Sequence, residues 1–445
     1  MPQPDFLDDI SSDGMPARKA ALSMLDQIFS QKKMLDSVLE RDRGYLDLPP
    51  RDRAFVRMMV ATILRRRGQI DDLIARAMNK GEEPRPETLK FILYIGVVQI
   101  MFMDVANHAA VDTAVNLASH NGLESKKGFV NAVLRRIAGE EGRKWLADQD
   151  AASLNIPEWL YLQWINSYGA VRAREIGNAC LTEAPLDFTV KDPAQKEEWA
   201  RKLAARILPT GSLRRPAGGH VADLEGFEDG AWWIQDASSA LPVRLFGDVA
   251  GKTVLDLCAA PGGKTAQLAA AGAKVVALDR SASRMKTLGE NLARLGFAES
   301  VQTIVEDGAG WQSRETFKYI LLDAPCTATG TIRRHPDLMA LKHQKDQDGL
   351  MSIQERLLVN AAALLEKGGL LIYCTCSLQK AEGEGQIQRF LHANGNFRRI
   401  PVRKEELGGL DGVVNSEGDV RVTPQILKDD GGMDGFFISR LQKIS

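Results

Sequence analysis

From residue 252 onward, the chain alternates short apolar runs with helix-like stretches. Most runs are separated by polar, helix-forming segments such as SRMKTLGENLARLG at 283–296. The runs are rich in valine, isoleucine and leucine, as buried strands are: KTVLDL (252–257), AKVVALD (273–279), VQTIVED (301–307), KYILLDA (318–324) and LLIYCTC (370–376). This alternation predicts an α/β fold with a doubly wound, mostly parallel sheet. Ligands of such sheets bind beyond the carboxyl ends of the strands, so the residues there are the first candidates for a site.

The rest of the chain has a different pattern. Residues 1–16 are acidic, contain Pro, Gly and Ser, and are predicted to be a disordered tail. Across 17–143 apolar residues recur at three- and four-residue steps, which predicts an all-α helical domain. Residues 144–235 hold one predicted strand, LDFTV at 186–190, and turn-rich text, and are predicted to form a small α+β linking domain. The sheet domain would then occupy 236–445.

Composition excludes several protein classes. The longest apolar run, FILYIGVVQIMFM at 91–103, is too short to cross a bilayer, which takes about 20 residues. We therefore expect a buried helix there and no membrane partner. Five cysteines make an odd number and suggest no disulfide framework, and no signal peptide is recognisable, so reducing cytoplasm is expected. The net charge of −1 hides a cluster that is either a solvated face or an anion-binding patch: Arg51, Arg53, Arg57, Arg65, Arg66 and Arg67.

The first predicted strand of the sheet leads into LCAAPGGKTAQLAA, a glycine turn that opens a helix. Its spacing matches neither a P-loop nor G-x-G-x-x-G, but it still brings backbone N–H groups and a helix N-terminus close to a ligand. The next three strands end at Asp279, Asp307 and Asp323. Carboxylates in register can accept hydrogen bonds from ribose hydroxyls, so they describe a nucleoside-shaped site. Each aspartate alone could instead cap a helix or a turn.

Four cysteines also lie at or near strand ends. Cys326 and Cys376 each lie just past one, whereas Cys258 and Cys374 are interpreted mainly as packing residues. Cys374 shares a strand face with Cys376 and so could lie near the site. A zinc site would need four ligands with other spacings, so we expect no metal.

These motifs together resemble a known family. CAAPGGK (258–264), LLDAPC followed by TATGTIRRHPD (321–337) and TCS (375–377) are similar to the RNA 5-methylcytosine methyltransferases of the RsmB/Sun type. Before them AALSML, PPRDRAFVRMMV and KKGFVNAVLRRIA resemble the NusB-type RNA-binding domain of this subfamily. The resemblance implies a Rossmann-like class I methyltransferase sheet behind a NusB-like helical domain, with S-adenosyl-L-methionine as cofactor and small-subunit (16S) ribosomal RNA as substrate. We expect a monomer. The alternatives are the same reaction on tRNA or another RNA, and an RNA-binding factor with an inactive methyltransferase fold; two retained cysteines argue against the latter.

The resemblance also implies residue roles. Asp279 would accept the ribose, Asp307 would lie near the adenine, and Asp323 would lie between cofactor and target base. Cys376 would be the nucleophile, and Cys326 would assist release of the product. The cofactor loop would consist of Cys258, Ala259, Ala260, Pro261, Gly262, Gly263 and Lys264.

The implied chemistry explains why thiols are needed. Carbon 5 of cytosine is a poor nucleophile, and addition of a thiolate to carbon 6 activates it. A free cysteine has a pKa near 8.5, so a cationic or hydrogen-bonding setting must favour the thiolate. Lys264 and a helix starting after Ser377 are the candidate sources, while Asp323 would hydrogen-bond N3 of the base. The target base must be splayed out of any helix to be reached.

Contacts with RNA phosphates are expected from the arginine cluster and from the basic segment RRHPD at 333–337, with His335 either contacting RNA or packing in its loop. Two departures from the family pattern stand out. Asp279 is followed by Arg280 and Ser281 without a second acidic residue, so the ribose contact would rest on one carboxylate. Lys191 stands where relatives often have Asn, so an RNA contact from that strand is not expected.

Overall fold

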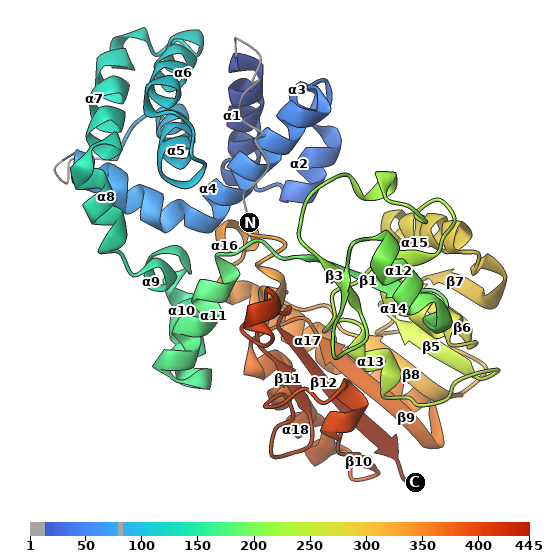
Figure 1. Ribbon diagram of the computed structural model, residues 1–445. Helices are drawn as coiled ribbons and strands as arrows, with labels where there is room; N and C mark the ends of the chain where they lie inside the picture. Colours follow the sequence, from blue (N-terminus) through green and yellow to red (C-terminus); the bar gives the residue numbers. More distant parts are fainter. Residues whose placement is uncertain (1–13, 79–82) are drawn as a thin grey trace. The chain divides into compact units, whose positions relative to one another are not determined.

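The computed structural model describes residues 14–78 and 83–445, so the predicted tail at 1–16 lies almost entirely outside the described residues. The described chain divides into two units (Figure 1). The first runs as far as Ile165 and adds Ala170–Thr182 and His335–Lys342. The second comprises Asn166–Gly169, Glu183–Arg334 and His343–Ser445. The loop that carries RRHPD is therefore divided between the two units.

The first unit is helical, as predicted for 17–143, but its helices continue to Cys180, into residues that were predicted to belong to the linking domain. Its elements are α1 (Met15–Phe29), α2 (Leu35–Arg41), α3 (Arg43–Leu46), α4 (Pro50–Ala77), α5 (Glu87–Phe102), α6 (Asn107–His120), α7 (Lys127–Ala138), α8 (Glu140–Ala147), α9 (Ala151–Asn155), α10 (Glu158–Tyr168, whose last residues belong to the second unit), α11 (Ala170–Cys180) and the short α16 (Leu338–Leu341). The apolar run at 91–103 forms most of α5, which lies in the core. Arg18 of α1 donates two hydrogen bonds to the buried Gln99 Oε1 of α5, at 3.1 and 2.6 Å. No described helix combines the length and apolar character needed to cross a bilayer.

A small antiparallel sheet opens the second unit. Its strands are β1 (Leu186–Val190), β2 (Arg206–Ile207), β3 (Leu213–Arg215) and β4 (Trp232–Ile234), in the order β2-β3-β1-β4. The predicted strand at 186–190 is confirmed. Phe188, Trp232 and Trp199 of helix α12 (Lys196–Lys202) form its apolar core, with the rings of Phe188 and Trp232 edge to face at 4.9 Å.

The large sheet contains all five predicted strands. They are β5 (Thr253–Leu257), β6 (Lys274–Asp279), β7 (Val301–Val305), β8 (Phe317–Asp323) and β9 (Leu365–Thr375), and they pair in parallel. Three further strands are antiparallel: β10 (Phe397–Arg399), β11 (Val420–Val422) and β12 (Phe436–Lys443). The order is β10-β12-β9-β8-β5-β6-β7, with β11 on β12, so the predicted doubly wound α/β fold is confirmed.

Helices cover both faces of this sheet (Figure 1). They are α13 (Leu241–Arg244), α14 (Gly263–Ala270), α15 (Ala282–Leu295), α17 (Gln344–Leu364) and α18 (Glu384–Ala393). The chain runs outward from β5 through β6 to β7, then returns to β8 beside β5. Ligands of such sheets bind where the strand order reverses, here at the carboxyl ends of β5 and β8. The CAAPGGK and DAPC motifs both begin at this point.

Candidate active site

The CAAPGGK loop joins the end of β5 to α14. Gly262 has a φ of 104°, and a Cβ there would stand 3.0 Å from Leu288 Cγ of α15, so both conformation and packing favour glycine. Cys258, where the loop begins, has its pKa raised by desolvation and then by the Asp279 carboxylate. Cys258 is thus a neutral thiol in the loop, as its interpretation as a packing residue requires.

Lys264, in the first turn of α14, is a buried cation. Its Nζ lies 2.7 Å from Asp323 Oδ2 and 3.0 Å from Ser239 Oγ, and 5.0 Å from the centre of the Phe436 ring. Burial would lower the pKa of Lys264, but the Asp323 carboxylate and the neighbouring Cys374 outweigh it, and the net shift is upward. Lys264, the predicted source of positive charge, is therefore a cation whose position is fixed by Asp323 and Ser239.

Asp323 and Cys374 are paired residues of β8 and β9. Cys374 Sγ lies 3.5 Å from Asp323 Oδ1, and the cysteine has no exposed surface. Burial, and then Asp323, raises the pKa of Cys374. Cys374 thus packs in the core, as predicted, and its thiol also contacts a predicted site carboxylate, because two parallel strands bring them into register.

The two predicted catalytic cysteines come together. Cys326 lies three residues beyond β8 and Cys376 directly follows β9, and their Sγ atoms are 3.5 Å apart. Both are free thiols. The contact with Cys376 raises the pKa of Cys326, and burial adds to the effect. Two thiols in contact can share one proton, so one can carry a negative charge that the other stabilises.

The sequence predicted a helix N-terminus after Ser377, which the structure does not have. After β9 the described chain passes through a 3₁₀ turn at Lys380–Glu382, and α18 begins only at Glu384. No helix dipole therefore starts beside Cys376. Lys264 remains as the cationic source named from the sequence.

Asp279 and Asp307 differ in their surroundings. Asp279 is buried, and its carboxylate accepts from Ala260 N at 3.3 Å and from Ser281 N at 2.9 Å, which ties it to the loop after β5. Asp307 is exposed, two residues beyond β7, and its Oδ1 accepts from Ala309 N at 3.0 Å as in a turn. Of the two, only Asp279 has a described contact with another predicted site residue.

Sequence reasoning missed Arg284. This arginine, in the first turn of α15, places Nη1 3.4 Å from Asp279 Oδ2 and donates from Nη2 to Ala260 O. Its side chain is half exposed. A basic residue five positions after the strand-end aspartate was the available signal, because the first turn of the following helix returns towards the strand end.

A cavity of about 320 Å³ lies against the CAAPGGK loop. Asp256 and Asp323 line it on the side of the sheet, and Trp233 and Gln235 line it from the end of β4. Asp256 is fully buried and accepts from Thr265 Oγ1 at 2.6 Å through Oδ2, whereas its Oδ1 has no described partner. Burial raises the pKa of Asp256 to about 7. A cavity with acceptor oxygens on one wall and aromatic and amide groups on another fits a cationic nucleoside such as S-adenosyl-L-methionine.

Comparison with known proteins agrees with this geometry. Two family models match this chain. The model of the family described as "16S rRNA methyltransferase RsmB/F" matches residues 245–442, and the model of the "NusB family" matches residues 15–139. The probable ribosomal RNA small subunit methyltransferase B of Synechocystis sp. is 32% identical, covering 96% of this chain and 99% of that protein. The chain belongs to the RsmB/F family of 16S rRNA methyltransferases. The corresponding methyltransferase B of Erwinia tasmaniensis is 31% identical over 96% of this chain and 98% of its own.

Solved structures agree with the RsmB/F assignment. The crystal structure of PH0851 covers 98% of this chain and 99% of its own with a TM-score of 0.75, at 24% identity, and so shows the shared fold. A methyltransferase homologue from Pyrococcus horikoshii is 25% identical, with a TM-score of 0.55 over 66% of this chain and 97% of its own. The protein is thus an S-adenosyl-L-methionine-dependent methyltransferase of small-subunit rRNA, and its predicted cofactor is confirmed at the level of the family.

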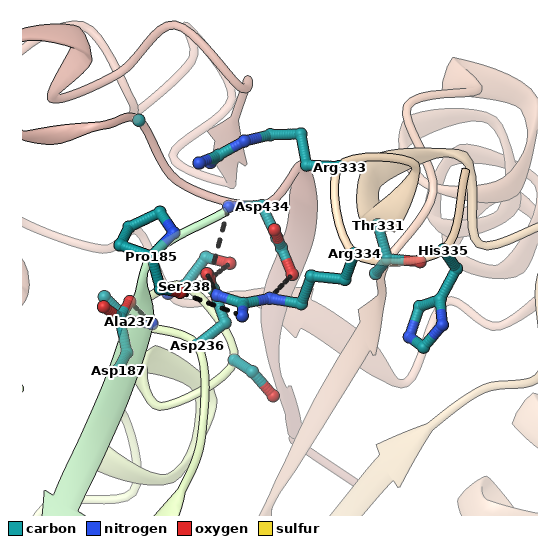
Figure 2. Close-up of polar contacts among 12 residues, drawn as sticks. Pro185, Asp187, Asp236, Ala237, Ser238, Thr331, Arg333, Arg334, His335 and Asp434 are labelled. Atoms are coloured by element: carbon teal, nitrogen blue, oxygen red, sulfur yellow. Dashed lines mark hydrogen bonds and ion pairs between the residues drawn. The ribbon is translucent and has the colours of Figure 1, made fainter. Parts of the chain in front are cut away.

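The RRHPD segment of this RsmB/F-family chain is not a phosphate-binding surface. Arg334 lies between two buried carboxylates (Figure 2): Nη2 is 2.8 Å from Asp236 Oδ2, and Nε is 2.8 Å from Asp434 Oδ2. Its Nη1 also donates to Pro185 O at 3.1 Å. Arg333 is 1% exposed and donates to Gly431 O. The prediction that these arginines contact RNA phosphates is wrong, because both guanidinium groups are used inside the protein.

The remainder of that segment belongs to the first unit. His335 Nδ1 lies 3.2 Å from Asp36 Oδ2, and the buried Asp337 accepts from Leu35 N at 3.0 Å, at the start of α2. His335 thus contacts α2, and its contact with RNA stays a prediction. Lys191 is also engaged, donating to Leu295 O at 2.5 Å.

The arginine cluster of α4 divides into two parts. Arg65 is buried, Arg66 lies 5.6 Å above the Phe102 ring, and Arg67 pairs with Asp71 at 3.8 Å. Arg51 and Arg57 are exposed, and Arg53 is half-buried. The exposed members of the cluster are thus Arg51, Arg57 and Arg67, and anion binding by them stays a prediction. Over residues 14–78 and 83–445, no group of three or more His, Cys, Asp or Glu side chains is arranged to hold a metal ion.

Proposed function

We propose that this enzyme forms 5-methylcytosine in 16S rRNA through a transient covalent bond between Cys376 and carbon 6 of the target cytosine. The observation that carries the proposal is the contact of Cys376 Sγ with Cys326 Sγ at 3.5 Å. The Lys264–Asp323 ion pair belongs to the same site, since both cysteines of the C-x-C pair contribute to the electrostatic field at Lys264. A nucleophile, a second thiol, a fixed cation and a carboxyl group are what the reaction requires.

The steps follow from these positions. The Cys376 thiolate adds to carbon 6 while Asp323, in the protonated form that this step requires, donates a hydrogen bond to N3 so that charge developing on the ring is offset. When bound, S-adenosyl-L-methionine supplies the methyl group that carbon 5 accepts. The proton on carbon 5 is then lost to water, the bond between carbon 6 and sulfur breaks, and the electron pair returns to Cys376. A hydrogen bond from the Cys326 thiol stabilises the departing thiolate, which is how Cys326 assists release.

The cofactor residues are assigned by the same proposal. The backbone of Ala259–Gly263 would hold the methionine part, with Cys258 and Lys264 at the two ends of the loop. Asp279 would accept from the ribose hydroxyls, and Asp307 would lie near the adenine. The donor that Asp256 Oδ1 lacks is consistent with a donor group on the cofactor. Asp323 would lie between cofactor and base.

The substrate assignment rests on the relatives and on the helical unit. The curated relatives are named as methyltransferases of small-subunit rRNA, and this chain has the NusB match at 15–139. We place RNA binding on the helical domain at 17–143 and methyl transfer at 236–445, with the linking domain at 144–235 between them in the chain. A ribosomal substrate places the enzyme in the cytoplasm.

Substitution of the two cysteines tests the mechanism. Cys376→Ala should abolish transfer of labelled methyl groups to 16S rRNA, whereas Cys326→Ala should accumulate a protein–RNA adduct on a denaturing gel. Cys180→Ala, in the helical unit, serves as the matched control and should leave both readouts unchanged. Undiminished methylation by Cys376→Ala would contradict the nucleophile assignment. Bisulfite sequencing of 16S rRNA and tRNA from cells with and without the enzyme would decide between the two substrates.

A further inference from the structure

Glu382 is a fully buried carboxylate beside the cysteine pair. It closes the 3₁₀ turn after β9 and has no exposed surface. Its Oε1 accepts from Thr327 N at 2.9 Å and from Gln354 Nε2 at 3.0 Å. Its Oε2 accepts from Thr327 Oγ1 and from Ser377 Oγ, both at 2.5 Å. Two oxygens that accept from four donors are what an ionised carboxylate provides.

The donors identify what Glu382 holds. Thr327 directly follows Cys326, and Ser377 directly follows Cys376. The carboxylate therefore joins the loop after β8 to the loop after β9 at the residues next to the two sulfur atoms. The hydroxyls of Thr327 and Ser377 also contact each other at 3.1 Å, so the three side chains form one buried network.

Glu382 is bound more closely to the loop of Cys326: two of its four donors belong to Thr327, and one, the hydroxyl of Ser377, belongs to the loop of Cys376. The hydrogen bond with Cys376 and burial raise the pKa of Cys326, and Glu382 is a further cause. On the opposite side, Lys264 pairs with Asp323, the strand partner of Cys374, and Cys376 follows Cys374 by two residues. An anion near one sulfur and a cation near the other favour the proton on the first and the negative charge on the second.

Resting on the proposed function, we propose that Glu382 is a positioning residue that assigns different roles to the two cysteines. It fixes their loops so that the sulfur atoms touch, and its negative charge keeps Cys326 protonated while Cys376 carries the thiolate. Cys326 then cannot compete for carbon 6, and its S–H remains available to the departing Cys376 sulfur. No proton is created or destroyed by this division: one proton is shared by two sulfurs, and Glu382 decides which sulfur holds it.

Other charged groups contact this network, so the experiment needs a control variant for the loss of a negative charge near it. Tyr373 on β9 donates its hydroxyl to Glu382 O at 2.8 Å. Arg421 on β11 donates to Ser377 O and pairs with Glu384 at 2.5 Å. Glu384 is thus a second carboxylate, two residues after Glu382 in the chain. It pairs with Arg421 but has no described contact with the hydroxyls of Thr327 and Ser377. Its neutralisation is the matched control for that of Glu382.

The test compares Glu382→Gln with Glu384→Gln by alkylation of the RNA-free full-length enzyme. Iodoacetamide labelling across pH 6–10, followed by peptide mass spectrometry, gives the rate at Cys326 and at Cys376 separately. Wild type and Glu384→Gln should label Cys376 first. Glu382→Gln should reduce the ratio of the labelling rate at Cys376 to that at Cys326 by about tenfold. Labelling of Cys326 should begin at a pH about one unit lower, since a tenfold change corresponds to one pKa unit. Glu382→Asp, which keeps the charge, should restore the preference even where the rate of methylation stays low.

The outcomes separate three cases. An unchanged preference in a folded Glu382→Gln variant, with slower methylation only, would reduce Glu382 to a packing role and overturn the proposal. If Glu382→Gln fails to fold, Glu382→Asp decides: it keeps the charge, and loss of the labelling preference in it would also overturn the proposal. Because alkylation requires no methyl transfer, a shifted preference in an enzyme that forms no 5-methylcytosine would count against the proposed function and not against Glu382.

Discussion

The two carboxylates that share Arg334 should respond in opposite directions to neutralisation. Asp236 accepts from Arg334 Nη2 at 2.8 Å and from both the N–H and the hydroxyl of Ser238, at 2.8 and 2.5 Å. Asp434 accepts from Arg334 Nε at 2.8 Å, but its Oδ1 is buried without a described partner (Figure 2). One guanidinium therefore serves two buried anions, of which only Asp236 is fully hydrogen-bonded.

The magnitude for Asp434 follows from its pKa. Burial raises this pKa, Arg334 lowers it and Asp236 raises it again, with a net value of about 6 against 3.8 for a free carboxyl. About two units correspond to about 3 kcal/mol. Because the folded pKa is the higher one, this is a cost of ionisation: it is absent below pH 3.8 and fully present above about pH 6. Asp434→Asn removes this cost, in which the hydrogen bond from Arg334 is already included. The variant should therefore gain up to about 3 kcal/mol at pH 7.5 and nothing at pH 4.

Asp236→Asn should do the reverse. Burial alone would raise the pKa of Asp236, but Arg334 and Ser238 outweigh it and the net shift is downward. Its ionisation therefore stabilises the fold above the free carboxyl's pKa, and that contribution is lost only in strong acid. Removing one partner of a buried ion pair typically costs about 3–5 kcal/mol, so this variant should lose that much at pH 7.5.

The assay is urea unfolding of the full-length protein, monitored by hydrogen exchange in peptides from β8 and β9. These peptides report the free energy of unfolding of the second unit alone. The free energy of unfolding should rank Asp434→Asn at or above wild type, with Asp236→Asn well below both. Loss of more than about 2 kcal/mol in Asp434→Asn at pH 7.5, together with a neutral Asp236→Asn, would refute the reasoning. The two carboxylates would then have to exchange the roles given to them.

Two further predictions concern ligands. Arg284→Ala frees the Asp279 carboxylate from a half-exposed ion pair worth at most about 1 kcal/mol, so the affinity for S-adenosyl-L-methionine measured by calorimetry should rise up to about fivefold; weaker binding would mean that Arg284 itself contacts the cofactor. Replacing Arg51, Arg53 and Arg57 together by alanine should lower the affinity for 16S rRNA fragments and reduce the salt dependence of binding, by up to about 0.7–0.9 in log–log slope for each phosphate that is no longer neutralised. An unchanged slope would make these arginines a solvated face.

The large sheet could be predicted from the sequence because its strands are continuous apolar runs between helix-like segments. Residues at strand ends could also be named, since the chain itself shows where each run stops. Their mutual distances could not be. Cys326 and Cys376 are 50 residues apart in the chain, and their contact depends on β8 lying beside β9. The same adjacency pairs Asp323 with Cys374, a contact that could not be predicted from the sequence.

In the RRHPD segment, the number of basic residues did not predict whether their side chains are exposed. Two adjacent arginines predict a basic surface only if no carboxylate neutralises them. The partners of Arg334 are 98 and 100 residues away in the chain, at Asp236 and Asp434, and no local sequence pattern predicts them.

Glu382 was missed for the opposite reason. It lies six residues after Cys376 in polar text that looks like an exposed turn, and its burial arises from the packing of α17 and β8 around it.

Three contacts support the separation of the two sulfur atoms, and two of them share Gly330. Gly330 N donates to Cys376 O at 2.9 Å, which holds the loop after β8 against the end of β9 by backbone alone. Gly435 N donates to Gly330 O at 2.8 Å, and Asp434, its neighbour in the chain, is fixed by Arg334. Glu382 joins the same two loops through side chains. Since each contact includes a residue within four positions of a cysteine, weakening one should disturb the thiol pair before it disturbs the cofactor loop. Methyl transfer should therefore be more sensitive than cofactor binding to substitutions in this region.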